Sequence, residues 1–181
     1  HAGQPLPIGG PKRRAIPAAL LVEHDRTVPR EALVDALWPD DPPLSAVNSV
    51  QAYVSRLRSI LGPGTIRTSG VGYTLLLSPH GFDAERFERL VKNGEEALAE
   101  GAAEEAAGAF EHALGLWRGP VLADLSGCGF VQAEAARLEE LRLVAHAARA
   151  DALLELGEYE HAATELQRHV GEHELDERFR S

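Results

Sequence analysis

The stretch from Ser45 to Leu61, SAVNSVQAYVSRLRSIL, decides the fold of the first half of this chain. Apolar side chains recur in it at intervals of three and four residues, at Val47, Val50, Val54, Leu57 and Leu61. This spacing is typical of an amphipathic α-helix, in which such residues share one face. We therefore expect a helix whose five apolar side chains lie in a hydrophobic core.

The opposite face of this helix has the composition of a surface that reads DNA. Its side chains are small, amide or guanidinium groups, at Asn48, Ser49, Gln51, Ala52, Ser55, Arg56 and Arg58. Asn and Gln bond adenine edges, Arg bonds guanine or phosphate, and small residues let the backbone approach the bases. The stretch contains no Asp or Glu, although 28 of the 181 residues are acidic. We interpret it as a recognition helix rather than an ordinary surface helix, which would usually carry Glu and Lys.

Two shorter helices are expected before the recognition helix. Apolar side chains share one side of residues 12–23, and a second helix over residues 30–38 ends at a proline-rich loop. Ser45, which follows that loop, is suited to cap the recognition helix. The three helices together predict a helix-turn-helix arrangement.

Basic residues cluster at the start of the first helix, at Lys12, Arg13 and Arg14. They suit a phosphate clamp or a solvated basic turn. Cations at a helix N-terminus oppose the helix dipole, so the sequence favours neither role over the other.

After the recognition helix the pattern changes to that of a β-hairpin. Strand residues flank the turn 69–72, at Ile66 and Thr68 before it and at Tyr73, Leu75 and Leu77 after it. Arg67 and Ser69 lie near the tip, where arginine can enter a narrow minor groove. We interpret the hairpin as the wing of a winged helix-turn-helix, although a plain hairpin that closes a small sheet has the same pattern. Leu6 and Ile8 suit a further short strand.

Beyond residue 81 the chain becomes alanine-rich, helical and acidic. The spacing predicts helices over residues 83–99, 104–116, 131–156 and 160–170, with Asp83 as the cap of the first. Residues 81–181 carry ten Lys or Arg against 22 Asp or Glu, whereas residues 1–80 carry eight against six. The excess of negative charge thus lies in the second half, so the first half is free to approach phosphate. We therefore expect two domains, residues 1–79 and 82–181.

The second half contains an internal repeat. In residues 97–114 and 153–170 a turn glycine is followed by an alanine five residues later and a bulky residue nine residues later, at Gly101, Ala106 and Phe110 and at Gly157, Ala162 and Leu166. This pattern is typical of tetratricopeptide (TPR) helix pairs, which stack into surfaces that bind other proteins. An alanine-rich bundle with coincidental glycine spacing is the alternative.

Several function classes are disfavoured by composition. A single cysteine, Cys128, excludes an internal disulfide and a multi-cysteine zinc site. Without an apolar run of eighteen residues or a signal segment, we expect no membrane span and no export, hence a cytoplasmic protein. We also expect no cofactor.

Of the functions considered for this chain, enzymatic activity is the least favoured. His169 and His173 are four residues apart on a helical segment, with Glu165 and Glu172 nearby, which is a possible zinc spacing. Exposed His and Glu pairs on acidic helices are, however, far commoner than zinc sites. Cys128 has no fixed basic neighbour in the sequence that would lower the pKa of its thiol.

The order of these segments resembles a known family. The segments GGPKRRA, ALVDALWPDDPP, SAVNSVQAYVSRLRSILG, IRTSGVGY, FERLVKNGEEALAEG, ALGLWRGPVLADL and EAARLEELRLVAHAARADALLELG are similar, from Gly9 to the end, to the SARP family of actinobacterial antibiotic regulatory proteins. The resemblance implies an OmpR-type winged helix joined to a helical bacterial transcriptional activation domain. It also implies double-stranded DNA with direct repeats, a second protomer on DNA and RNA polymerase holoenzyme as partners.

Roles carried over by position complete the expected site. The major-groove residues would be Asn48, Gln51, Ala52, Ser55 and Arg56, with Arg58 nearer phosphate. Trp38 would contact phosphate at the end of the second helix, and Arg67, Ser69 and Tyr73 would belong to the wing. Pro29 departs from the family pattern, because a Ser or Thr cap is common there, and the N-terminal strands of the family are reduced to Leu6 and Ile8.

The sequence therefore predicts a mainly α fold with a small β-hairpin wing, in which a winged helix-turn-helix precedes a TPR-like all-α domain. The expected function is that of a DNA-binding transcriptional activator, and the family resemblance implies the control of a secondary-metabolite gene cluster. The alternative is a TPR-like protein-interaction module with a vestigial DNA-binding head.

Overall fold

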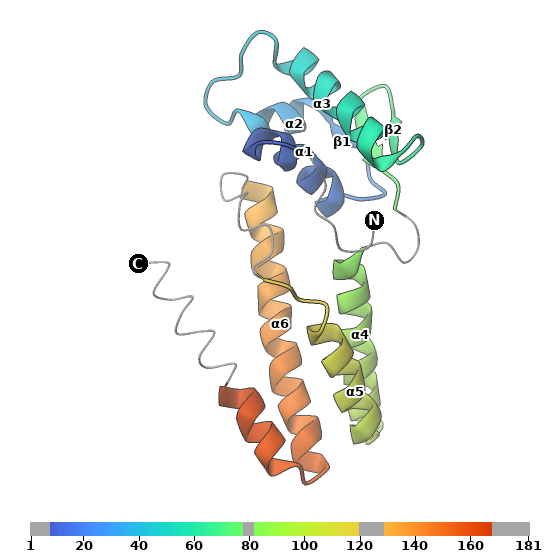
Figure 1. The fold of residues 1–181 in the computed structure, drawn as a ribbon, viewed down its shortest axis with the longest axis vertical. Coiled ribbons are helices and arrows are strands. Elements are labelled where there is room, and N and C mark those ends of the chain that lie inside the picture. Colours follow the sequence, from blue (N-terminus) through green and yellow to red (C-terminus); the bar gives the residue numbers. More distant parts are fainter. Residues whose placement is uncertain (1–7, 78–81, 120–128, 168–181) are drawn as a thin grey trace. The chain divides into compact units, whose positions relative to one another are not determined.

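The computed structural model describes residues 8–77, 82–119 and 129–167 (Figure 1). Its contacts divide the chain into two compact units, residues 1–81 with 122–136 and residues 82–121 with 137–181. Each unit has a hydrophobic core of its own. The predicted fold class, a winged helix-turn-helix followed by a helical TPR-like domain, is confirmed.

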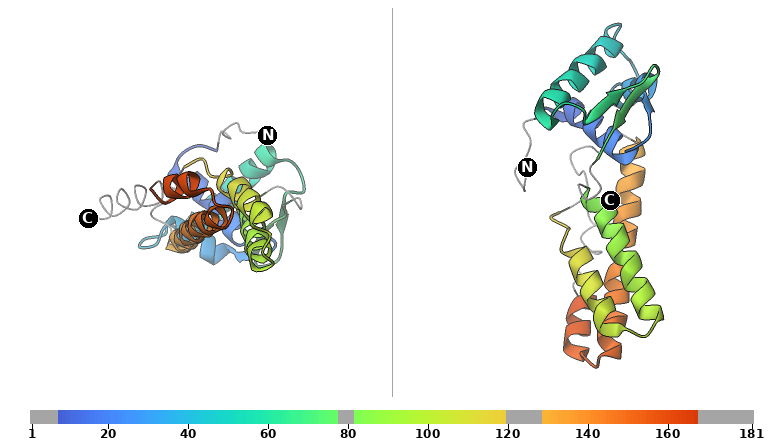
Figure 2. Two further views of the ribbon diagram at one scale, coloured as in Figure 1. Left: turned by 90° about the horizontal axis from the view of Figure 1, so that it is seen from below. Right: turned by 90° about the vertical axis from the view of Figure 1, so that its right-hand side faces the viewer.

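The first unit is built from three helices and three short strands. In chain order they are α1 (Pro11–Val22), β1 (Val28–Pro29), α2 (Arg30–Leu37), α3 (Ala46–Leu61), β2 (Ile66–Thr68) and β3 (Gly72–Leu75). The strands form an antiparallel sheet in the order β1-β3-β2, in which Tyr73 lies opposite both Val28 and Thr68. Figure 2 shows this sheet beside the three helices.

Strand β1 was not predicted, so the wing belongs to a three-stranded sheet rather than to an isolated hairpin. Pro29 is tolerated because β1 is a two-residue edge strand, where a missing N–H costs little. Gly72 allows the close pairing, since a Cβ there would lie 1.9 Å from the carbonyl oxygen of Val28. Of the strand expected near the N-terminus, Leu6 lies outside the described residues, and Ile8 packs against the core without forming a strand.

The core of the first unit confirms most of the apolar stripe on α3. Val50, Val54 and Leu57 are at most 2% exposed, and Leu61 packs against the same core. Val47 was expected in the core but is 44% exposed, and Ala46 is buried in its place. The helix begins at Ala46, directly after Ser45, as expected. Ala46 and Val47 lie four and three residues before Val50, so helical spacing allows either on the core side, and the core takes Ala46.

The predicted caps differ from those in the structure. Ser45 stands at the N-cap position of α3, but its side chain makes no capping bond. The N–H of the first helical residue, Ala46, donates to the carbonyl of Pro43 at 2.8 Å. Asp83 lies in the first turn of α4 rather than at its N-cap, and its carboxylate pairs with Arg118. An acidic group in the first turn still interacts favourably with the helix dipole.

The second unit is helical, with α4 (Asp83–Ala99), α5 (Ala103–Leu114), the greater part of α6 (Gly129–Glu155) and a further helical segment over residues 159–167. Its core contains Phe87, Val91 and Phe110 from α4 and α5, with Leu138 and Ala145 from α6. Within the described parts of the chain, no helix has the length and apolar character needed to cross a membrane.

The turns of the two helix pairs repeat the same hydrogen bonds, although Phe110 is buried and its counterpart Leu166 is 44% exposed. The amide of Gly101 donates to Leu98 and that of Ala102 donates to Ala97, which is the double hydrogen bond of a Schellman C-cap. The same two bonds recur 56 residues later, from Gly157 to Leu154 and from Glu158 to Leu153. The predicted repeat is therefore present in the backbone.

Candidate nucleic-acid interface

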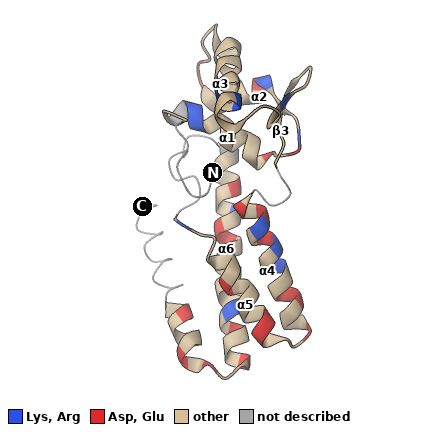
Figure 3. Cartoon of the chain, turned by 45° about the vertical axis from the view of Figure 1, so that its right-hand side comes forward, with Lys and Arg blue, Asp and Glu red and all other residues tan. Residues whose placement is uncertain are grey.

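Helix α3 contains no acidic residue (Figure 3). Of the side chains predicted to read bases, five are exposed and Ser49 is half-buried; the exposed ones are Asn48, Gln51, Ala52, Ser55 and Arg56. Because Val50, Val54 and Leu57 hold the other side of the helix in the core, the direction of this face is fixed. It offers amide and guanidinium donors beside small residues, as major-groove readout requires.

Arg13 lies next to this face. Its guanidinium carbon is 5.7 Å from the centroid of the Tyr53 ring, which belongs to α3. Arg13 and Arg56 also line the same hollow, together with Ile8 and Ile60. Within the residues that the structure describes, neither arginine pairs with a carboxylate, so two positive charges adjoin the recognition helix without a neutralising partner.

Arg14 and Trp38 are set further into the first unit. Arg14 is half-buried, unlike the exposed Arg13. Trp38 is the C-cap of α2, donates its backbone N–H to the carbonyl of Val34 at 2.8 Å, and packs partly buried against the core. A phosphate contact by either residue stays a prediction.

The three predicted wing residues differ in accessibility. Arg67 is exposed on β2. The Ser69 hydroxyl accepts the Gly72 N–H at 3.2 Å, so it helps to close the turn. Tyr73 is only 4% exposed and belongs to the core, which makes it a support of the wing rather than a surface for DNA.

Arg58, expected near phosphate, is half-buried and turned toward the hairpin. Arg30, the first residue of α2, was missed by the sequence reasoning, although its guanidinium carbon lies 5.8 Å from the centroid of the Tyr73 ring. No spacing rule joins residues 43 positions apart. The two meet because β1, which leads directly into α2, pairs with β3.

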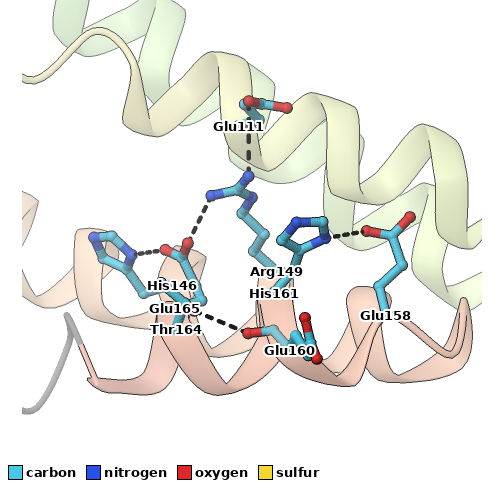
Figure 4. A network of polar contacts seen from close by, with 8 residues as sticks. All are labelled: Glu111, His146, Arg149, Glu158, Glu160, His161, Thr164 and Glu165. Atoms are coloured by element: carbon cyan, nitrogen blue, oxygen red, sulfur yellow. Dashed lines mark hydrogen bonds and ion pairs between the residues drawn. The ribbon is translucent and has the colours of Figure 1, made fainter.

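The second unit holds a buried polar network (Figure 4). Glu165 is 3% exposed and bonds the imidazole of His146; its second carboxylate oxygen accepts from Arg149 at 2.6 Å. Arg149 also lies 3.7 Å from the Glu111 carboxylate on α5. The network thus ties residues 159–167 to α6 and α6 to α5.

The zinc and thiol candidates gain no support from the geometry. The described residues contain no group of three His, Cys, Asp or Glu side chains that could hold a metal ion. Glu165 is engaged by His146 and Arg149 instead. The other candidates, His169, Glu172, His173 and Cys128, lie outside the described residues.

Comparison with known proteins decides the family. Residues 82–181 match the family described as bacterial transcriptional activator domain, and residues 4–75 match the one described as transcriptional regulatory protein, C terminal. The chain belongs to the SARP family of transcriptional regulators. This family consists of regulators rather than enzymes, and DNA binding and transcription regulation are its properties.

Individual relatives of this SARP regulator extend well beyond it. It is 37% identical over 179 residues to the regulatory protein AfsR of Streptomyces coelicolor, with 98% of this chain and 18% of AfsR covered. It is 34% identical over 177 residues to the regulatory protein DnrI of Streptomyces peucetius, with 92% and 65% covered. The chain thus spans between about a fifth and two thirds of the length of these two relatives.

A solved structure supports the fold over nearly the whole of this chain. Mycobacterium tuberculosis EmbR, in complex with a low-affinity phosphopeptide, superposes with a TM-score of 0.88 at 37% sequence identity. The match covers 94% of this chain and 47% of the EmbR chain.

Proposed function

We propose that this SARP regulator is a sequence-specific transcriptional activator that binds tandem repeats near a promoter through α3 and the wing. One observation carries the proposal: the exposed face of α3 has no acidic residue, and Arg13 and Arg56 line one hollow beside it without a carboxylate partner among the described residues. Bringing such charges to a phosphate backbone releases counterions and supplies affinity, while Asn48 and Gln51 supply base recognition.

The charge distribution supports different binding functions for residues 1–79 and residues 82–181. The first part is slightly basic and suits DNA, whereas the second is strongly acidic and is repelled by phosphate. We assign the second part to protein contacts, with RNA polymerase holoenzyme and a second protomer on the adjacent repeat as the partners. The regulated genes would be a secondary-metabolite cluster, and the protein would act in the cytoplasm.

A second candidate function rests on the end of the helical unit. Leu154, Tyr159 and Leu166 are between 44% and 69% exposed there, and large apolar side chains that gather on a surface mark protein-interaction sites. A TPR-like module that binds another protein, with a head that no longer binds DNA, would also have such a surface.

The deciding experiment is binding of the full chain to a labelled promoter fragment from its own gene neighbourhood, titrated with salt and with random competitor DNA. An activator that reads an operator should show a steep fall of affinity with salt and a preference of about a thousandfold or more for the specific fragment. Weak, unselective binding would instead assign the function to the helical unit and its protein partner.

A further inference from the structure

The last turn of α3 is fastened to the wing by Arg58. Its Nε donates to the carbonyl oxygen of Ile66 at 3.0 Å, and its Nη2 donates to the hydroxyl of Thr68 at 2.5 Å. Its guanidinium carbon lies 5.9 Å from the centroid of the Tyr73 ring. One side chain thus contacts both β2 and β3.

These contacts place Arg58 apart from the face that is proposed to read DNA. Residues two positions apart on a helix point to different sides, so Arg56 is exposed while Arg58 faces the hairpin. A guanidinium has five N–H donors in a rigid fork, and two of them are used on β2. Arg58 therefore faces the hairpin, on a different side of α3 from Arg56.

The two residues that Arg58 bonds flank Arg67. Ile66 is 3% exposed and points into the core, so the next side chain along the strand, that of Arg67, points outward. Because the bonds of Arg58 hold the strand on both sides of Arg67, they fix where the Arg67 guanidinium is presented relative to α3.

A second tether reaches the same hairpin from α2. The backbone N–H of Arg30 donates to the carbonyl of Val71 at 3.1 Å, and the Arg30 side chain lies over Tyr73. Tyr73 is thus contacted by arginines from both helices of the helix-turn-helix. The hairpin is thereby attached to the recognition helix on one strand and to α2 at its turn.

We propose that Arg58 is a positioning residue for DNA recognition, which rests on the function proposed above. It sets the spacing between the reading face of α3 and Arg67, so that base contacts in the major groove and the wing contact are made together. Its own guanidinium contacts the hairpin and not a phosphate.

Arg58→Lys separates this role from a phosphate contact. Lysine keeps the charge, so a contact with phosphate would largely survive, but it cannot bridge Ile66 and Thr68 with a planar fork. The full chain is compared with the Arg58→Lys, Arg67→Ala and double variants on the specific promoter fragment and on random DNA. Arg58→Lys should weaken specific binding about tenfold and leave random binding nearly unchanged.

Non-additivity is the decisive readout. If Arg58 acts through Arg67, Arg58→Lys should change specific affinity less than about twofold in the Arg67→Ala background. Fully additive losses, or full affinity in Arg58→Lys alone, would overturn the proposal. A variant that is merely destabilised would lose specific and random binding alike, and such a result would also count against it.

A measurement without DNA keeps this inference separate from the proposed function. Backbone ¹⁵N order parameters of residues 67–71 should fall from about 0.85 toward 0.6 in Arg58→Lys and in Thr68→Val, because the wing loses its tether. Arg56→Lys is the matched control and should leave them unchanged. If the wild-type chain failed to select its promoter, the proposed function would fail, whereas unchanged order parameters in Arg58→Lys would refute the tether itself.

Discussion

Gly101 and Gly157 adopt the same left-handed conformation, with φ of +75° and +77°, at the same step of two helix pairs. Each ends a helix with the paired hydrogen bonds of a Schellman motif, and each is followed five residues later by an alanine that is at most 1% exposed. The same glycine turn, followed by a buried alanine at the start of the next helix, therefore occurs in both helix pairs.

Replacing either glycine with alanine should destabilise the helical unit by about 1–2 kcal/mol, because a Cβ is disfavoured at positive φ. Gly108→Ala is the matched control: Gly108 lies inside α5 with nothing within 4 Å of an added Cβ, so alanine should stabilise by about 0.5–1 kcal/mol. Urea unfolding followed by circular dichroism measures both. Equal effects at the turn and control positions would contradict the repeat geometry.

Glu165→Ala should cost about 3 kcal/mol, because it removes the buried carboxylate that bonds both His146 and Arg149 and leaves Arg149 only its longer contact with Glu111. Glu158→Ala is the comparison, since Glu158 only pairs with His161 at the surface and should cost under about 1 kcal/mol. Hydrogen exchange of the amides in residues 159–167 reports the local effect. Similar protection in both variants would show that the network does not hold this segment.

Gly94→Ala should overpack the core between α4 and α5, since an added Cβ would lie 2.7 Å from the Phe110 ring. A loss of about 1–3 kcal/mol is expected from unfolding curves. Phe110→Leu removes the clashing ring edge. The double variant should therefore lose less stability than the sum of the losses in the two single variants. Simple additivity would mean that the two residues do not meet.

Gly72→Ala should separate β1 from β3, because an added Cβ would lie 1.9 Å from a backbone carbonyl oxygen that cannot move aside cheaply. We expect weaker specific DNA binding and faster hydrogen exchange at Tyr73. Gly70→Ala adds a Cβ into open space in the same turn and should preserve both properties. Loss of binding in both variants would point to the turn sequence instead of the sheet.

Arg56→Ala and Arg13→Ala should weaken DNA binding in different ways. If Arg56 bonds a base, its loss should cost about 1–3 kcal/mol and relax specificity at one position of the operator. Loss of Arg13 should weaken binding to all sequences and reduce the salt slope by about 0.9, as expected for one phosphate contact. Competition with single-base operator variants at several salt concentrations distinguishes them, and identical behaviour would refute the two roles.

The helices could be predicted because their evidence is local. The three- and four-residue spacing of apolar residues predicts α3, because burial of one helix face depends on residues that are close in the chain. Glycine predicts the turns at residues 101 and 157 for the same reason, since a left-handed turn depends on its immediate neighbours. Errors fell at the helix starts, where Ala46 replaced Val47 in the core and Ser45 made no capping bond. Ala46 and Val47 are four and three residues before Val50, so both fit the helical spacing, and the periodicity alone does not decide which of them is buried.

By itself the sequence determined the order of the helices and of the hairpin, the acid-free face of α3, the helical repeat and the contrast in charge between the two halves. Only the tertiary structure decided that β1 completes the sheet, that Tyr73 is buried, that Arg58 and Arg30 meet at its ring, and that Glu165 joins His146 and Arg149. Helical faces and turns follow from residues that are close in the chain. The contacts between distant residues follow from the packing of the cores. Many pairings are chemically possible, and close packing in the folded state decides which of them form.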